Sequence, residues 1–269
     1  MSRQTKTPNS AITGENVDIV DHQQGLYRST NATRRWLHTS RRDWIVSAIE
    51  RHCPRSAVRV LEVGPGSGIY LPFLSSKARE VFAMDIEEKY LDNARRLQNQ
   101  YANITVVKDD ITTTRFARGS FDLILCSEVI EHLADSRAAL RNLNALLNPS
   151  GILVLSTPQR YSLLELTGKV ALSRAFIGLT RLVYREPVLE MGHINLLTAS
   201  ECVEQITTAN FAIVERYKAG LYLPLIAEFL GFAGLSFERW LEDRINNSPF
   251  DFALWTQYYV LRSRVAFSP

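Results

Sequence analysis

Short apolar blocks and longer amphipathic blocks alternate along the chain, and this pattern predicts strands and helices in turn. Continuous apolar runs, typical of strands buried on both faces, lie at 58–63, 80–85, 103–110, 121–127 and 151–158. Amphipathic stretches, typical of helices that cover a sheet, lie at 28–52, from Ile69 onward, at 88–101 and at 129–147. The alternation predicts an α/β fold with a Rossmann-like, doubly wound parallel sheet.

The alternation changes after Pro158. A helix is predicted at 198–210, with Thr198 and Glu201 as a capping box. Strands are predicted at 211–217 and 253–264, which makes seven in all. The intervening segments, 159–195 and 219–252, are expected to form helical cap inserts. Residues 1–22 are polar and are expected to form a flexible N-terminal segment.

Composition narrows the class of protein. The chain has 269 residues, 46% of them hydrophobic and 22% charged, as in an ordinary globular protein. A net charge of +3 is too small to indicate nucleic-acid binding, so no such partner is expected. The three cysteines are far apart in the sequence, a usage typical of a reducing compartment. Without a signal-peptide pattern or an 18-residue apolar run, we expect a cytoplasmic protein.

The glycine-rich stretch VLEVGPGSG at 60–68 is the first candidate binding feature. Glycine permits backbone angles that a side chain forbids, so such a loop can bring its amides close to a ligand. Asp85 ends the next strand, roughly 20 residues further on, where an acidic residue meets ribose hydroxyls in nucleotide-binding folds. The spacing GxGxG, with Ile69 where a dinucleotide-binding loop has its last glycine, disfavours a nicotinamide dinucleotide.

Four segments together resemble class I S-adenosylmethionine-dependent methyltransferases, of the group related to the ubiquinone-biosynthesis O-methyltransferases. They are VLEVGPGSG (60–68), KDDITTTRFARGSFDLILCSEVIEHL (108–133), LNPSGILVLSTPQ (147–159) and GHINLLTASE (192–201). The resemblance covers 56–158 well and 192–217 less closely. It implies a methyltransferase domain at 23–269, a seven-stranded sheet with the last strand antiparallel, and S-adenosyl-L-methionine as the cofactor.

The resemblance also implies cofactor-binding residues. Glu62 and Gly64 would hold the methionine portion, Gly66 would permit close backbone approach, and Ser127 would line the wall beside the methyl donor. The residues implied for the adenosine portion are Asp85 for the ribose hydroxyls, Ile86 against adenine, Asp110 for the adenine amino group and Ile111 over the ring. Asp109 is interpreted as a solvated loop residue.

Methyl transfer to a hydroxyl requires alignment, exclusion of water and a group that removes a proton. His132, just past the fourth strand, and His193, at the return from the first insert, are the candidate catalytic bases; a structural role is the alternative for each. Tyr27 and Tyr161 are weaker candidates for closing the pocket. No metal-binding Asp/His set follows the fourth strand, so no metal is expected.

The inserts allow two interpretations. Residues 166–185 have a helical pattern that brings Arg174, Arg181 and Arg185 to one face, and 220–240 is strongly apolar. These segments are either helical caps that pack on each other, or the walls of an acceptor tunnel and a surface for peripheral membrane contact. The basic run RRWLHTSRR at 34–42 is either a solvated helix face or a source of an arginine for the cofactor carboxylate.

The predicted function is methyl transfer from S-adenosylmethionine to a small, hydrophobic acceptor, at oxygen, with a histidine as general base. Two other classes stay open. One is a cofactor-binding enzyme that catalyses a cyclisation or rearrangement without transferring its methyl group. The other is a non-catalytic partner subunit.

Overall fold

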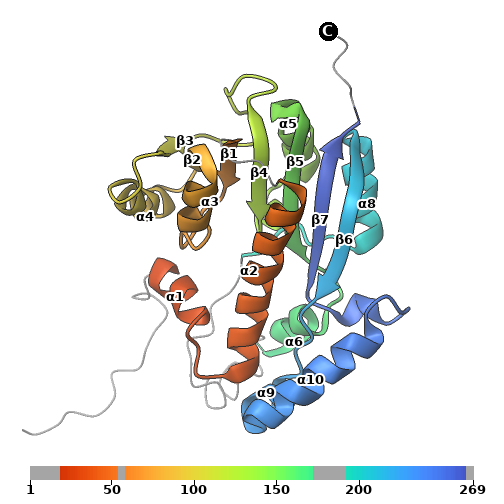
Figure 1. The fold of residues 1–269 in the computed structure, drawn as a ribbon. Helices are drawn as coiled ribbons and strands as arrows, with labels where there is room; N and C mark the ends of the chain where they lie inside the picture. Colours follow the sequence, from red (N-terminus) through yellow and green to blue (C-terminus); the bar gives the residue numbers. More distant parts are fainter. Residues whose placement is uncertain (1–18, 54–57, 172–191, 265–269) are drawn as a thin grey trace, which may run out of the picture.

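A computed structural model describes residues 19–53, 58–171 and 192–264 (Figure 1). Seven strands form one sheet in the order β3-β2-β1-β4-β5-β7-β6. Their bounds are β1 Val58–Val63, β2 Ala78–Asp85, β3 Ile104–Lys108, β4 Phe121–Ser127, β5 Leu147–Pro158, β6 Phe211–Ala219 and β7 Thr256–Ser263. Strands β1 to β5 pair in parallel, whereas β7 is antiparallel to both of its neighbours. The predicted sheet with an antiparallel last strand is therefore confirmed.

Helices cover both faces of the sheet. On one face lie α2 (Ala32–His52), α3 (Leu71–Lys77) and α4 (Glu88–Gln98), and their apolar residues share a core with β1 and β2. On the other face lie α5 (Ser136–Leu146) and α8 (Ala199–Thr208), which pack on β4, β5 and β7. In Figure 1, α2 and α3 are in front of the sheet and α5 and α8 are behind it. Both faces are buried because the strands are apolar on both sides.

The loops that follow β1, β2, β4 and β5 all leave the same edge of the sheet, since parallel strands end on one side. A short helix, α1 (Ile19–Leu26), lies below this edge in Figure 1. Residues 19–22, expected to be part of a flexible segment, are thus helical. The predicted capping box of α8 is present, with Thr198 and Glu201 bonded to each other's backbone N–H groups.

The stretch 129–147 is not one helix, as its amphipathic pattern predicts. It forms a short 3-10 turn, η2 (Ile130–His132), and then α5. The break arises because the Asp135 side chain accepts a hydrogen bond from the N–H of Ala138 at 2.8 Å and starts a new helix there. This interruption keeps His132 at the edge of the sheet, close to the end of β4.

The two inserts supply the remaining helices of the described residues. The first contributes α6 (Leu163–Ala171), and the second contributes α9 (Pro224–Phe229), α10 (Gly231–Ile245) and the 3-10 turn η3 (Asp251–Ala253). Most of the predicted helix at 166–185, including its three arginines, lies outside the described residues. In Figure 1, α6, α9 and α10 are gathered at the lower end of the molecule.

Candidate active site

Glu62 and the glycine loop form the innermost wall of the site. The Glu62 side chain is buried at the end of β1, and its Oε2 atom has no hydrogen-bond partner. Burial raises the pKa of this carboxyl group to about 8. Gly64 and Gly66 both have positive φ, at 68° and 50°, and a Cβ at Gly66 would lie 2.9 Å from Gln23 Oε1. A narrow backbone cradle beside an unpartnered buried carboxyl group fits a cationic ligand group such as an ammonium.

Two adjoining cavities open at this edge of the sheet. One, of about 270 Å³, is lined by Glu62, Ser127 and His193, among others, and the other, of about 380 Å³, by Asp85, Ile86 and Ile111. Gly64, Gly66 and His132 line both, so the two cavities form one continuous site. All the site residues predicted from the sequence line it except Asp110.

The adenosine side of the site contains Asp85 and two acidic neighbours from the loop after β3. Burial raises the pKa of Asp85, whose Oδ1 accepts a hydrogen bond from the N–H of Glu87 at 2.8 Å. The Asp110 carboxylate is turned into its own loop, where Oδ1 accepts from the N–H and the hydroxyl of Thr112. Asp109, interpreted from the sequence as a solvated residue, lines the cavity instead.

Arg41 and Glu128 form an ion pair in the wall of the same cavity. Glu128 follows β4 and has a φ of 57°, a conformation that costs energy for a residue with a side chain and often marks a functional site. Arg41 comes from the basic run at 34–42 and is buried, so that run is not wholly a solvated helix face. The sequence reasoning missed Glu128, although its position directly after the fourth strand was the available signal.

His132 and His193 are brought together although they are distant in sequence. Their ring centroids are 5.1 Å apart. The backbone N–H groups of Ile194 and Asn195 both donate to the carbonyl of Glu131, at 3.0 and 2.9 Å, and this fixes the second segment beside the first. Burial, followed by the neighbouring His193, lowers the pKa of His132. His132 is therefore neutral at pH 7, which is the form that accepts a proton.

Several other side chains complete the walls on the histidine side. Tyr27 lines the cavity, as expected for a residue that closes the pocket, whereas Tyr161 is half-exposed and lies elsewhere. His38 also lines the cavity, between the rings of Tyr27 and Trp255. Nothing in the sequence around His38 or Trp255 indicates this, because they meet only through the packing of α2 on the strand edge.

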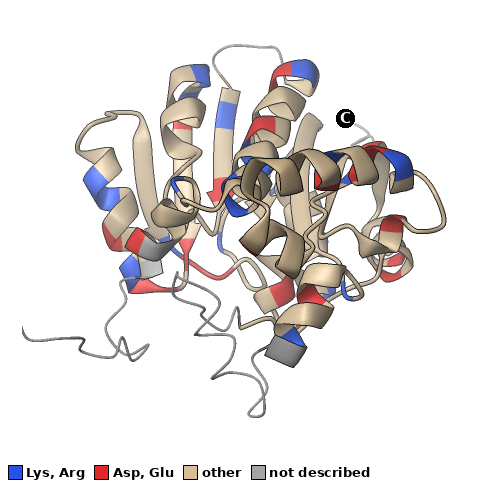
Figure 2. Cartoon of the chain, turned by 90° about the horizontal axis from the view of Figure 1, so that it is seen from below, with Lys and Arg blue, Asp and Glu red and all other residues tan. Residues whose placement is uncertain are grey.

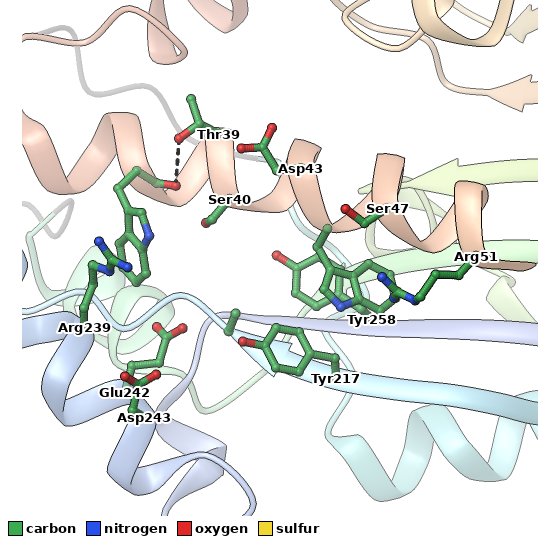
Figure 3. Close-up of a pocket in the computed structure, with 13 residues that line it drawn as sticks. Thr39, Ser40, Asp43, Ser47, Arg51, Tyr217, Arg239, Glu242, Asp243 and Tyr258 are labelled. Atoms are coloured by element: carbon green, nitrogen blue, oxygen red, sulfur yellow. Dashed lines mark hydrogen bonds between the residues drawn. The ribbon is translucent and has the colours of Figure 1, made fainter. Parts of the chain in front are cut away.

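A separate pocket of about 500 Å³ lies between α2, α10 and the β6–β7 pair (Figure 3). Trp36, Trp44, Tyr217 and Tyr258 form much of its wall. Its Glu242 already accepts hydrogen bonds from the N–H groups of Gly220 and Leu221. None of the predicted cofactor-binding residues lines this pocket, so the site at the strand edge is the candidate active site.

A glycine loop after β1 and an acidic residue at the end of β2, on a sheet with this strand order, define a fold of the S-adenosylmethionine-dependent methyltransferase class. The family model described as a methyltransferase domain matches residues 17–216, and the chain belongs to this family. The cofactor of the family is S-adenosylmethionine, and the buried Glu62 and the glycine cradle fit its cationic methionine portion.

Curated relatives match the central part of the chain. A probable S-adenosylmethionine-dependent methyltransferase of Mycobacterium tuberculosis is 32% identical over 112 residues, which are 41% of this chain and 40% of the relative. A ubiquinone biosynthesis O-methyltransferase of Coxiella burnetii is 32% identical over 113 residues, 42% of this chain and 48% of the relative. The chain thus spans less than half the length of the curated relatives it matches.

Solved structures share the fold over most of the chain. A putative sarcosine dimethylglycine methyltransferase from Galdieria sulphuraria has a TM-score of 0.60 at 12% identity, covering 91% of this chain and 99% of the other. A complex of the Haloferax volcanii Trm112 methyltransferase activator with a putative methyltransferase gives 0.60 at 17% identity, covering 93% and 100%. The [4+2]-cyclase SpnF gives 0.56 at 13% identity, covering 83% and 81%. At these identities the likeness shows the fold alone.

Proposed function

We propose that the protein transfers the methyl group of S-adenosylmethionine to an oxygen atom of a small, hydrophobic acceptor. One observation carries the proposal: the unpartnered buried carboxyl group of Glu62 and the His132–His193 pair open on the same cavity. The first suits the charged end of the cofactor, and the second lies where an acceptor hydroxyl must lose its proton. The O-methyltransferases among the curated relatives support oxygen as the methylated atom.

The cofactor supplies an electrophilic methyl group on a sulfonium sulfur when it is bound. Glu62 would bind its ammonium group, the backbone at Gly64 and Gly66 would lie against the methionine portion, and Asp85 would accept from the ribose hydroxyls. Ile86 and Ile111 offer apolar surface for the adenine ring, and Ser127 lies in the wall near the histidines. Binding at both ends fixes the direction of the methyl group.

The histidine pair activates the acceptor in this proposal. A hydroxyl is a poor nucleophile until its proton is removed, and a neutral imidazole accepts that proton. His132 is partly exposed to the cavity, whereas His193 is nearly buried beside Glu165. Trp255 and Tyr27 give the same cavity aromatic walls, which favour an apolar acceptor and keep water out.

The proposed reaction is tested with the purified chain, labelled cofactor and a panel of phenols, hydroxyquinones and hydroxylated lipids. We expect S-adenosylhomocysteine and an O-methyl ether in equal amounts, measured by mass spectrometry. An acceptor that rearranges without forming S-adenosylhomocysteine would indicate the cyclisation alternative. Tight cofactor binding without turnover on any acceptor would indicate a partner subunit.

The second insert supports a hydrophobic acceptor through an inverted helix. The residues that α10 buries are Gly234, Glu238 and Glu242, one helical turn apart. The two glutamates accept hydrogen bonds from backbone N–H groups at 220–223. Phe232, by contrast, is 73% exposed. The polar side of this helix therefore faces the protein and its apolar side faces outward.

The outward apolar residues of α9 and α10 form a patch that we call the α9–α10 patch. It consists of Leu225, Phe229, Leu230, Phe232, Phe237 and Trp240. Figure 2 shows the molecule from this end, with the first half of α10 uncharged and its charged residues in the second half. The Asn31 side chain donates to the carbonyl of Ala227 at 3.0 Å, so the patch adjoins the α1–α2 connection that carries Tyr27.

We propose that the α9–α10 patch rests on an anionic lipid surface from which a hydrophobic acceptor enters. The Arg244 guanidinium lies 4.4 Å from the centre of the Trp240 ring, a pairing that suits the boundary between acyl chains and headgroups. None of the helices that the structure describes is both long and apolar enough to cross a membrane.

Removing two of these aromatic side chains tests the contact. For the Phe232→Ser, Trp240→Ser double variant we expect flotation with phosphatidylglycerol-containing vesicles to fall by roughly tenfold or more, because about 2 kcal/mol of apolar burial is lost per ring. High salt should weaken wild-type binding only in part. Val214→Ser, at an exposed position of β6, is the matched control. Equal flotation of all three proteins, or none, rules out the lipid surface.

A further inference from the structure

Glu131, His132 and His193 gather at one point in the wall of the active-site cavity. Each offers one potential metal-ligand atom, and these atoms all lie within 4.8 Å of one another. Two of the residues belong to η2, and the third arrives from the far end of the first insert. No metal was expected from the sequence, because the third residue is 60 positions away from the others.

The carboxylate of this group has an oxygen without a partner. Glu131 is fully buried, and its Oε2 atom accepts a hydrogen bond from the Thr157 hydroxyl at 2.9 Å. Its Oε1 atom has no hydrogen-bond partner and lies 4.0 Å from His132 Nε2. A buried carboxylate oxygen of this kind requires a cation or a proton donor, since burial without one is costly.

Both imidazole rings are oriented by a bond at their other nitrogen. His193 Nδ1 lies 3.2 Å from Glu165 Oε1, and His132 Nδ1 lies 3.2 Å from the carbonyl of Gly192. Each Nδ1 can therefore carry the proton and donate it, which leaves the Nε2 lone pair of each ring available. Glu165 is in turn fixed by the Trp255 N–H at 3.3 Å. Metal-binding histidines commonly have such a carboxylate or carbonyl partner.

We propose that Glu131, His132 and His193 bind a divalent transition-metal ion of the zinc type. Two imidazole nitrogens and one carboxylate oxygen are a donor set that suits Zn²⁺ and its neighbours better than Mg²⁺, which prefers oxygen ligands. Three protein ligands leave coordination positions open to the cavity, as in catalytic rather than structural sites. Glu128, the other carboxylate in this wall, is neutralised by Arg41.

The role of the ion rests on the proposed function. The ion binds the acceptor oxygen and lowers the pKa of its hydroxyl, and the proton leaves to solvent. The oxygen then forms a bond to the methyl carbon as the bond from that carbon to sulfur breaks, and the sulfonium becomes a neutral thioether. An imidazole nitrogen that binds a metal does not also accept a proton, so the ion replaces the histidines as the activating group.

Metal binding is measured on the full chain, purified without a histidine tag and stripped with a chelator. We expect one Zn²⁺ per chain by calorimetry, visible absorption bands on addition of Co²⁺, and much weaker binding of Mg²⁺. His132→Ala and His193→Ala should each weaken Zn²⁺ binding by roughly 100-fold or more. His52→Ala is the control, because His52 pairs with Glu215 away from the site.

Each outcome separates this inference from the proposed function. No stoichiometric Zn²⁺ binding to the wild type, or equal binding to the His132→Ala variant, overturns the metal site. His132 is the decisive position because its side chain is 42% exposed and its replacement leaves little cavity in the core. Methyl transfer that persists in chelator would then leave the proposed function and the histidine base in place. Metal binding without methyl transfer on any acceptor would leave the metal site and remove the function.

Discussion

Replacing Glu62 with glutamine is expected to weaken S-adenosylmethionine binding by roughly 30- to 1,000-fold, which corresponds to about 2–4 kcal/mol. The reason is the loss of a buried negative charge opposite the ammonium group of the cofactor. Glutamine has nearly the same shape, so the pocket should keep its form. Isothermal titration calorimetry at pH 7 measures the change. Glu204→Gln, at an exposed carboxylate of α8, is the matched control.

Proton release gives a second measure of the same interaction. Burial raises the pKa of Glu62 to about 8, so this carboxyl group is largely protonated at pH 7 in the free protein. An arriving ammonium group favours the carboxylate, and up to one proton should leave per cofactor bound. The dependence of the binding enthalpy on buffer ionisation enthalpy reports this number. Unchanged affinity and unchanged proton release in Glu62→Gln would contradict the assignment of Glu62.

The raised pKa of Glu62 also sets a direction for stability in the absence of cofactor. Between about 4.5 and 8 the folded chain binds a proton here that the unfolded chain does not. The corresponding stabilisation is complete below pH 4.5 and is lost as the pH rises through about 8. It amounts to on the order of 4 kcal/mol, and Glu62→Gln should lack this pH dependence in denaturant unfolding.

Replacing both His132 and His193 with alanine is expected to lower turnover by roughly 10²- to 10⁴-fold. The pair is the only imidazole pair in contact within the described residues, and it lines the cavity proposed for the acceptor. The loss follows whether the rings take the proton themselves or bind an ion that lowers the pKa of the hydroxyl. Steady-state rates with saturating cofactor and acceptor measure the effect.

Cofactor affinity separates this effect from damage to the pocket. Neither histidine is assigned a contact with the cofactor, so calorimetry should give the same affinity for the wild type and the double variant within a few fold. His52→Ala again serves as the control, since its ring pairs with Glu215 on the outer part of the sheet. Full turnover in the double variant would show that another group activates the acceptor.

Local pattern was sufficient for the sheet and most of the helices that cover it. Strands buried on both faces are continuously apolar, so β1, β2, β4 and β5 are visible in the sequence as uninterrupted runs. The pattern was insufficient at 129–147, because amphipathic spacing continues through a break that a side-chain cap creates at Asp135. It was also misleading in α10, where the apolar residues face outward.

The sequence by itself determined the residues that depend on their neighbours in the chain: the glycine loop, the acid at the end of β1 and the acid at the end of β2. Their positions follow from parallel strands ending at one edge. Only the tertiary structure decided what meets across that edge. It turned Asp110 into its own loop, joined Arg41 to Glu128, and placed His193 beside Glu131 and His132. Such contacts join distant segments, and residue spacing along the chain carries no information about them.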